Sequence, residues 1–438
     1  MVKVAKFGGS SLADGERIRH ACELVRSDPD RRFMVVSAPG KRGNDDEKIT
    51  DLLYHLSEQK ESGADYSGTL KRISDRFESI VQDLGITFDL DREFDLIRDR
   101  LKDASAAWIV SRGEYLCGKI TAAFLDWPFV DAAHLIRFRP DGSLEESLTY
   151  ANARRVLEDY ECAVIPGFYG SGPNGKIMVF TRGGSDVTGS IIARAVDADL
   201  YENWTDVSGI MSADPRIIDD PRQIRWISYR ELRELSYMGA SVLHEDAVFP
   251  LKNTGIPIRV CNTMDPENEG THIVGKYPVD LVNHPVTGIA GKCGFSNLQI
   301  EMAMMNSQVG FGARILEIIA KHGISYEHTP TSIDIMSVIA DTPSMMQHRN
   351  EILQEIDREY HPDRMFIQDG MALVAVVGEG ISTNVGVAAK VLASIAEAGI
   401  NVRMIDAGCS ELNIIIGVNE SDYEKTIRAL YEGLYEYL

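Results

Sequence analysis

A lysine followed by two glycines near the start of the chain is the strongest chemical signal in this sequence. Lys6-Phe7-Gly8-Gly9-Ser10-Ser11 follows an apolar segment, Val2 to Phe7, which we predict to be a β-strand. Glycine has no Cβ, so the backbone N–H groups of such a turn can approach an anion closely. A helix that begins after the turn adds the positive end of its dipole. Lys6 could then place its ammonium on a phosphoryl oxygen, although a lone motif of this kind is more often a tight turn with a solvated lysine.

A second double glycine, in Thr181-Arg182-Gly183-Gly184-Ser185-Asp186, repeats the same arrangement at another expected strand end. The guanidinium of Arg182 offers a bidentate fork for the α-carboxylate of an amino acid. Asp186 could align a lysine or bind a substrate ammonium. Ser185 and Asp186 also fit the N-cap of a helix that we expect over 187–195, and both interpretations can hold together.

A third polar cluster runs from Thr205 and Asp206 to Ile210 and continues in Asp214-Pro215-Arg216. A nucleotide needs hydrogen-bonding groups for its base and ribose and a cation near its phosphates, and this segment contains both. Its spacing alone indicates only a loop.

Two other motifs are interpreted as coincidences. Residues 170–176 match GxxxxGK, but Ile177 stands where a P-loop needs Ser or Thr for magnesium, and a strand is expected where a helix is required. We therefore predict a hairpin loop there. Asn203-Trp204-Thr205 matches a glycosylation acceptor, yet the N-terminus lacks the apolar core of a secretory signal.

The composition argues against a nucleic-acid-binding protein, a membrane-spanning protein and a protein held together by disulfides or zinc. The 438 residues carry a formal net charge of −21, which argues against a nucleic-acid partner. No apolar run has the ~18 residues that a membrane span needs. The six cysteines form no CxxC pair and no His/Cys cluster, so we expect no zinc site and no disulfides, and a cytoplasmic location.

The order of expected elements indicates an α/β protein. Strand, glycine turn, helix and a strand over 33–36 open a sheet whose ligands bind at the strand ends. Residues 42–110 are charged and rich in helical periodicity, and we interpret them as an insertion that covers one edge of the sheet. Strands return after Ala163, and the unit is expected to run to about 274, before a polar stretch at 276–285.

The last third of the chain contains an internal repeat. VGFGARILEIIAKHGI over 309–324 corresponds to VGVAAKVLASIAEAGI over 385–400, an offset of 76 residues. Each copy is flanked by apolar strands in the order β-α-β-β, which is typical of a small sheet covered on one face. Such a pair after a catalytic unit favours a regulatory role, with oligomerisation alone as the alternative.

In their order along the chain, KFGGSS, SAPGK, KITDLL, SRGEYL, GFYG, TRGGSDVTG, WTDVSGI, ADPR and GASVLH resemble the motifs of aspartate kinases. The resemblance covers essentially the whole chain and implies a monofunctional enzyme. It implies a carbamate-kinase-like, three-layer α/β/α amino acid kinase domain over 1–275, a linker over 276–285, and two ferredoxin-like ACT domains over 286–438. These would comprise about 297–364 and, interlocked with it, 286–293 plus 365–438.

The resemblance also implies the reaction. ATP, with Mg²⁺, would phosphorylate the side-chain carboxylate of L-aspartate to give 4-phospho-L-aspartate, the first step toward lysine, threonine and methionine. The substrate carboxylate is already an anion at neutral pH, so no general base is needed. Catalysis would consist of in-line positioning and charge neutralisation.

Site residues are carried over by motif. The catalytic set would be Lys6, Arg182 and Asp186. The aspartate pocket would consist of Ser37, Thr50, Glu114, Arg182, Gly183 and Ser185, with Glu114 near the substrate ammonium. The nucleotide would contact Lys6, Gly8, Gly9, Ser10, Thr205, Asp206, Asp214 and Arg216.

One departure from the family pattern concerns the phosphate-binding cations. Many members read GAKVLH where this chain has Ser241 in GASVLH, so a lysine that reaches the ATP phosphates is missing. Lys252 or Lys41 are the alternatives for its replacement.

The ACT pair implies an end-product effector, for which we favour lysine, and a homodimer or homotetramer. The effector pocket would comprise a helix start and a facing strand, namely Gln308, Gly310, Phe311, Gly312, Ala313, Thr331, Ser332 and Asp334. Ordinary helix capping and strand pairing explain these residues about equally well. Two other functions stay open at this point: a kinase for another amino acid carboxylate, and a catalytically silent amino-acid-binding regulator.

Overall fold

The computed structural model describes residues 1–181, 183–240, 243, 245–277, 285–407 and 411–438. The chain forms two compact units. The first comprises Met1–Ile210, Gln223–Leu232 and Ser241–Tyr277, and the second comprises Met211–Arg222, Arg233–Ala240 and Pro278–Leu438. The expected domain limits stay a prediction, because most of the expected linker lies outside the described residues. No helix in the described ranges is both long and apolar enough to cross a membrane.

The first 277 residues contain both strands and helices, with a run of consecutive helices from α2 to α8 between β2 and β3. The strands are β1 (Lys3–Phe7), β2 (Arg31–Val36), β3 (Ala163–Pro166), β4 (Tyr169–Ser171), β5 (Ile177–Val179), β6 (Leu200–Thr205), β7 (Ile210–Met211), β8 (Gln223–Ile224), β9 (Trp226–Ser228), β10 (Ile258–Asn262) and β11 (Thr271–Val274). The helices are α1 (Gly15–Arg26), α2 (Ile49–Ser62), α3 (Ser67–Leu84), α4 (Leu90–Leu101), α5 (Ala106–Val110), α6 (Arg112–Leu125), α7 (Ala132–Leu135), α8 (Glu146–Leu157), α9 (Gly184–Ala195), α10 (Tyr229–Tyr237) and α11 (Glu245–Val248).

The first unit is built on a seven-stranded sheet in the order β3-β2-β1-β6-β10-β11-β9. The five strands from β3 to β10 are parallel, and β11 is antiparallel to β10. Parallel neighbours place the carboxyl ends of β1, β2 and β6 at one edge of the sheet, where ligands of open α/β folds bind. The α/β class expected from the sequence is confirmed.

Strand β1 faces two helical layers. Ala5 and Phe7 lie in one core with Ile18 and Val25 of α1, whereas α9 packs against β1 as well. Side chains alternate along a strand, so Val4 and Lys6 point to the other face. Helix α1 forms because its apolar residues recur at helical spacing and the side chain of Asp14 caps it by accepting a hydrogen bond from the Arg17 N–H (2.9 Å).

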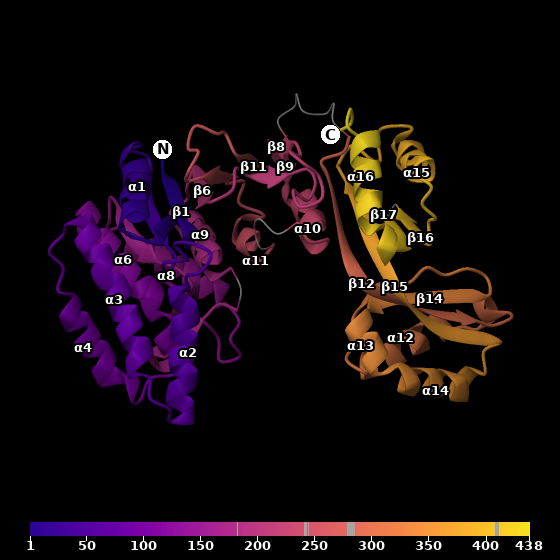
Figure 1. The fold of residues 1–438 in the computed structure, drawn as a ribbon, viewed down its shortest axis with the longest axis horizontal. Coiled ribbons are helices and arrows are strands. Elements are labelled where there is room, and N and C mark those ends of the chain that lie inside the picture. The colour runs from indigo at the N-terminus through magenta and orange to yellow at the C-terminus, as the bar shows by residue number, and fades with distance from the viewer. Residues whose placement is uncertain (182, 241–242, 244, 278–284, 408–410) are drawn as a thin grey trace. The chain divides into compact units, whose positions relative to one another are not determined.

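Helices α2, α3 and α4 run side by side (Figure 1). Ile73, Phe77 and Ile80 of α3 are buried at three- and four-residue spacing, in the same core as β1, β2 and α1. The expectation that residues 42–110 cover an edge of the sheet is therefore wrong, because this amphipathic helix turns its apolar side into the core on one face of the sheet.

The segment that matched part of a P-loop is a hairpin, as predicted. Strands β4 and β5 pair antiparallel, with Tyr169 opposite Val179. The N–H of Gly172 donates to the carbonyl of Lys176 (2.8 Å) and closes the loop between them.

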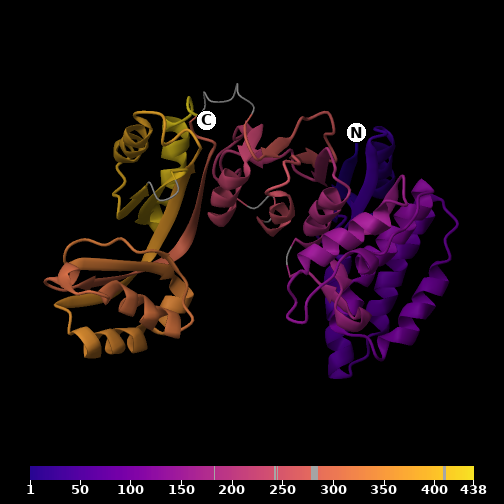
Figure 2. The ribbon, with the colours of Figure 1, turned by 180° about the vertical axis from the view of Figure 1, so that it is seen from behind.

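The second unit carries a six-stranded sheet with helices at both of its ends (Figures 1 and 2). Its strands are β12 (Gly288–Glu301), β13 (Tyr326–His328), β14 (Ile335–Asp341), β15 (Arg364–Val377), β16 (Met404–Ala407) and β17 (Asn413–Asn419). Its helices are α12 (Phe311–Lys321), α13 (Thr342–Gln347), α14 (Arg349–Tyr360), α15 (Val387–Glu397) and α16 (Tyr423–Gly433). The bounds of α12 and α15 differ by 76 residues, the offset of the sequence repeat.

The sheet order β13-β14-β12-β15-β17-β16 joins the two repeats through their first strands. Strands β12 and β15 have 14 residues each and pair antiparallel along most of their length. Residues 288–292 pair with 373–377, and residues 297–301 pair with 364–368. One continuous sheet therefore serves both repeats.

A segment from the middle of the chain completes the core of the second repeat. Ala213, Ile217 and Ile218 are buried together with side chains of β15, β17 and α16. The carbonyl of Ser212 accepts a hydrogen bond from the N–H of Ile289 in β12 (2.7 Å). The sequence did not indicate this packing, because residues 211–222 follow a motif of the kinase half.

Candidate active site

A cavity of about 820 Å³ opens at the carboxyl ends of β1, β2 and β6. It is large enough for a nucleotide and a small acid together. Most of the residues that the sequence singled out for substrate binding line it, although they come from distant segments. These are Lys6, Gly8, Gly9, Ser10, Ser37, Thr50, Glu114, Gly183, Ser185, Asp186, Thr205 and Asp206.

Lys6 is held by a carboxylate and an amide. Its ammonium forms an ion pair with Asp186 and donates a hydrogen bond to Oδ1 of Asn203 (3.4 Å). Nδ2 of Asn203 in turn donates to Oδ1 of Asp186 (2.9 Å). Lys6 and Asn203 are buried on adjacent strands in register, and Asp186 lies in the first turn of α9. The charge of Lys6 is therefore fixed in position at the cavity wall.

Asn203 is a residue that the sequence interpretation missed. It lies within β6, and its only sequence signal was the coincidental glycosylation motif. The alternation of β6 could have identified it, because Tyr201, Asn203 and Thr205 share one face, and Thr205 was already a candidate.

The glycine turn after β1 presents free backbone donors. The N–H groups of Ser11 and Leu12 bond to the carbonyls of Gly8 and Gly9, whereas those of Gly9 and Ser10 have no hydrogen-bond partner in the described part of the chain. A Cβ on Gly9 would lie 2.9 Å from the carbonyl oxygen of Ala38, and Gly40 donates its N–H to the Gly9 carbonyl (2.8 Å). The turns after β1 and β2 thus touch through glycines.

Arg17 ties the same two turns together. Its Nη1 donates to the carbonyls of Ser10 and Lys41, each at 3.1 Å, and its Nη2 donates to that of Arg42 (3.2 Å). The loop after β2 is also fastened by Asp46, whose pKa is held well below its usual range by hydrogen bonds from Arg42 and the charge of Arg76. This carboxylate therefore stays ionised at neutral and mildly acidic pH.

Three further cations of that loop, Lys41, Arg42 and Lys48, line the cavity. Lys41 was one of the two alternatives for the family lysine that is missing at Ser241. Lys252, the other alternative, is not among the described lining residues, and Ser241 itself lies outside the described residues. Sequence reasoning missed Arg17, which no motif marks, and Lys48, which begins the KITDLL motif but was given no role.

Glu114 is a buried acid with an incomplete set of partners. Its side chain is 4% exposed, and Oε2 has no hydrogen-bond partner in the described structure. Burial raises the pKa of Glu114 to about 8, and this effect is only partly opposed by backbone hydrogen bonds and the charge of Arg112. A buried carboxyl of this kind at a cavity wall is suited to receive a cationic ligand.

Helix α9 points its N-terminus into the cavity. Gly183 is its N-cap residue, with φ of 55°, a conformation that favours glycine. The helix begins at Gly184, three residues before the predicted start, and no side chain caps it. The expected Ser185-Asp186 cap is therefore wrong: both residues lie inside the first turn, and the carboxylate of Asp186 is used by Lys6 and Asn203 instead.

Three candidates are not placed in the cavity. Arg182 lies outside the described residues. Asp214 and Arg216 belong to the second unit, where Nη2 of Arg216 donates to Oδ2 of Asp214 (2.7 Å). Hydrogen bonds from the Arg216 side chain hold the pKa of Asp214 below its usual value. Their assignment to the nucleotide stays a prediction.

The candidate effector residues lie at the start of α12 and in the hairpin between β13 and β14. Gly310 is the N-cap residue of α12, with φ of 88°, and Phe311 to Ala313 form its first turn, after Gln308. Ser332 and Asp334 were expected on a strand, and this is wrong: they lie in the hairpin between β13 and β14, where the Ser332 N–H donates to the carbonyl of Ile335 (2.7 Å). Thr331 forms a single antiparallel bridge with Met336. Oδ1 of Asp334 accepts the N–H of Met304 (2.8 Å), so this carboxylate already has a backbone partner.

Comparisons with known proteins agree with these observations. Residues 1–262 match the amino acid kinase family, and residues 374–434 match an ACT domain. Aspartokinase 3 of Bacillus subtilis is 36% identical over 453 residues, which cover 99% of both chains.

Structures of two known enzymes resemble this one over nearly the whole chain. Aspartate kinase of Clostridium acetobutylicum is 43% identical, with a TM-score of 0.91 over 99% of both chains. Escherichia coli aspartokinase III in complex with aspartate and ADP is 26% identical, with a TM-score of 0.76 over 99% of this chain and 100% of that one. A structure of the same E. coli enzyme in complex with lysine and aspartate is 27% identical, with a TM-score of 0.74. The chain belongs to the amino acid kinase family and, within it, to the aspartokinases.

Proposed function

We propose that the 820 Å³ cavity of this aspartokinase is where the γ-phosphoryl group of ATP passes to the side-chain carboxylate of L-aspartate. One observation carries the proposal: the buried, incompletely partnered Glu114 shares the cavity with the paired Lys6 and with the free N–H groups of Gly9 and Ser10. A site for a cation and a site for anions thus face the same space. This combination suits an amino acid beside a polyphosphate.

Aspartate binds between the ends of β2, α6 and α9. The carboxylate of Glu114 receives the substrate ammonium, and its ionised form is stabilised when that cation arrives. Ser37 and Thr50 supply hydroxyl groups at the same wall. Gly183 and Ser185 offer backbone donors at the start of α9, where the helix dipole favours the α-carboxylate. Arg182, by its place in the motif, completes this carboxylate site.

The nucleotide phosphates bind at the glycine turn. Gly8, Gly9 and Ser10 surround them with backbone groups, and Lys41 takes the role of the lysine that the family has at the position of Ser241. Thr205 and Asp206, at the end of β6, face the same cavity. Asp214 and Arg216 are proposed as further nucleotide contacts on the motif alone.

The cavity fits magnesium bound to ATP. Asp206 is an exposed carboxylate in its wall, and hard cations of this kind prefer oxygen ligands. Bound Mg²⁺ neutralises phosphate charge, which favours attack by a second anion.

The protein's own part in the reaction is to bring two anions together and neutralise them. The attacking carboxylate needs no base, because it is ionised at neutral pH. The ammonium of Lys6, oriented by Asp186 and Asn203, stabilises the negative charge of the phosphoryl group in transfer. The N–H donors of the glycine turn add to this effect without reorganising. No covalent enzyme intermediate is needed.

Regulation is proposed to act through the second unit. Lysine, present with aspartate in a structure of the E. coli relative, is the effector that we favour. It would bind at the start of α12, where Gln308 and Gly310 to Ala313 present a helix N-terminus to its carboxylate. Thr331 and Ser332 of the hairpin would complete the pocket, in a homodimer or homotetramer. We infer a cytoplasmic location from the free cysteines of the described residues.

An aspartate hydroxamate assay tests the proposal, run with and without lysine, threonine and methionine. We expect ATP-dependent product with aspartate, little with glutamate, and inhibition by lysine. Glutamate turned over as well as aspartate would contradict the assigned pocket. Inhibition by threonine or methionine alone would contradict the assigned effector.

A further inference from the structure

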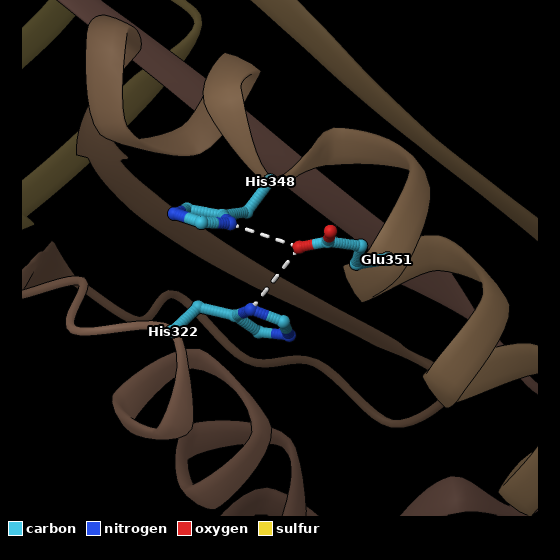
Figure 3. Close-up of side chains that lie close together, drawn as sticks. All are labelled: His322, His348 and Glu351. Carbon is cyan, nitrogen blue, oxygen red and sulfur yellow. Dashed lines mark hydrogen bonds and ion pairs between the residues drawn. The ribbon is translucent and has the colours of Figure 1, made fainter.

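Two histidines and a glutamate from two different helices meet in the first repeat of the second unit (Figure 3). His322 follows the end of α12, and His348 is the N-cap residue of α14, whose first turn contains Glu351. Nδ1 of His348 lies 2.9 Å and Nδ1 of His322 lies 3.5 Å from the same oxygen, Oε2 of Glu351. We propose that His322, His348 and Glu351 bind a zinc ion that joins α12 to α14.

The spacing of the donor atoms fits a tetrahedral ion. Ligand atoms about 2.0–2.1 Å from a tetrahedral zinc lie about 3.3 Å from one another. The two separations between a histidine nitrogen and the glutamate oxygen, 2.9 and 3.5 Å, bracket this value, and the two nitrogens lie within 4.8 Å of each other. The side chain of Glu351 is 64% exposed, so it has room to shift slightly and still bind the ion that enters between the three ligand atoms. Two imidazoles and one carboxylate leave the fourth position for water, a common zinc arrangement.

A second carboxylate, that of Glu355, lies near Nε2 of His322, the ring nitrogen that does not face Glu351. Nε2 of His322 is buried and has no hydrogen-bond partner in the described structure, and Oε2 of Glu355 lies 3.7 Å from it. Glu355 is itself held by Lys321, whose ammonium donates to Oε1 (2.6 Å). A zinc-bound imidazole usually donates its other N–H to a carboxylate, which fixes the ring and makes it a better ligand. Ion binding through Nδ1 would draw Nε2 and Glu355 into this relationship.

Ordinary helix-surface pairs do not account for the cluster. His20 and Glu23, and His55 and Glu58, also stand three positions apart on helices, but their atoms are 3.9 Å apart. Neither pair receives a histidine from another helix within the described ranges. In the proposed site the ring centroids of His322 and His348 are 5.0 Å apart, and both rings address one oxygen. A metal ion requires several ligand atoms that converge on one point, whereas a single ion pair requires only two groups.

The sequence alone favours the absence of a zinc site, because no cysteine pair or His/Cys cluster is present. The proposed site revises that expectation. The ligands are separated by 26 positions, and only the packing of α12 against α14 brings them together.

The test is a zinc titration of the full-length protein against a chromogenic zinc indicator, under reducing conditions. We expect the wild type to bind one more equivalent of zinc per chain than the variant H322Q/H348Q. The matched control H55Q/E58Q, which changes a pair on α2, should bind as the wild type does. The proposal is overturned if H322Q/H348Q retains that equivalent, or if the control loses it.

Two single variants make the test independent of the double substitution. Glu351→Gln removes an exposed ligand and should weaken zinc binding more than tenfold while the circular dichroism spectrum is unchanged. Glu355→Gln should weaken it by about 10–100-fold. Zinc at 100 times its Kd should raise the Tm of the wild type by about 5–10 °C and leave that of Glu351→Gln unmoved. Equal affinity of wild type and Glu351→Gln would refute the site.

Discussion

The ammonium of Lys6 forms an ion pair with the carboxylate of Asp186, which lies in the first turn of a helix far along the chain. Because Lys6 and Asp186 are both largely buried at the cavity wall, the pair holds a positive charge where the phosphoryl group is expected. We predict that Lys6→Ala lowers kcat by about 10²–10³-fold and raises the KM for aspartate far less. Steady-state kinetics with the hydroxamate assay measure both.

Lys3→Ala is the matched control for that variant. Lys3 lies on the same strand but pairs with Asp28 (2.6 Å), and it does not line the cavity. We expect near wild-type kinetics from it. A near-normal kcat in Lys6→Ala would refute the assigned role.

Asn203 is predicted to act through Lys6 as a positioning residue. Its amide bridges Lys6 and Asp186, so Asn203→Ala removes one hydrogen bond from each charged group while their ion pair with each other remains. Because a hydrogen bond to a charged group is worth about 1.5–3 kcal/mol, we expect kcat to fall by about 10–100-fold. The KM for ATP should change little. If KM rises while kcat is kept, Asn203 contributes to binding and not to positioning.

Lys41 is predicted to replace the family lysine that is absent at position 241. Lys41→Ala should raise the KM for ATP by about tenfold, which corresponds to about 1.4 kcal/mol, with a smaller effect on the KM for aspartate. Lys252→Ala serves as the control, because Lys252 is exposed and does not belong to the described cavity lining. The reverse result, a large effect at Lys252 and none at Lys41, would reassign the second phosphate-binding cation.

The raised pKa of Glu114 predicts a pH dependence of substrate binding. Below its folded pKa of about 8 the free enzyme holds a proton on this carboxyl, and an arriving ammonium favours the ionised form. The KM for aspartate should therefore fall as pH rises toward 8, by up to about tenfold per pH unit. Glu114→Gln should show a higher KM with little pH dependence. Parallel pH profiles for the two proteins would exclude Glu114 from the ammonium site.

The raised pKa of Glu114 also predicts how the free energy of unfolding changes with pH. A carboxylate in a surface salt bridge adds stability as pH rises, whereas Glu114 should reduce it. Between the ordinary pKa of 4.5 and the folded value of about 8, the native state keeps a proton that the unfolded chain releases, so stability falls as pH rises. Glu114→Gln avoids this loss. Its free energy of unfolding should exceed that of the wild type by up to about 3 kcal/mol at pH 7, and by little below pH 4.5. Denaturant unfolding at pH 4.5 and 7 measures the difference.

Local patterns in the sequence are sufficient to identify the residues that follow strand ends. Lys6, Gly9 and Asp186 stand in or beside glycine turns that could bind anions, and the resemblance to aspartate kinases assigned all three to one site. Asn203 was missed because no glycine turn stands beside it, so that only the alternation of faces along β6 distinguishes it. Residues 211–222 were assigned to the kinase half because their motif belongs there, yet Ile217 and Ile218 pack in the core of the second repeat. Contacts of that kind depend on tertiary packing, which the local hydrophobic periodicity of a sequence does not reveal.

The two long strands β12 and β15 restrict how this part of the protein can change during evolution. Each strand runs through both repeats, and two register shifts between residues 292 and 297 mark the junction of the two halves while the strands themselves continue. If recombination exchanged only one repeat with a relative, it would cut both β12 and β15. The new segments would then have to continue both strands in the correct register. The duplicated pair is therefore expected to be inherited and exchanged as a single block.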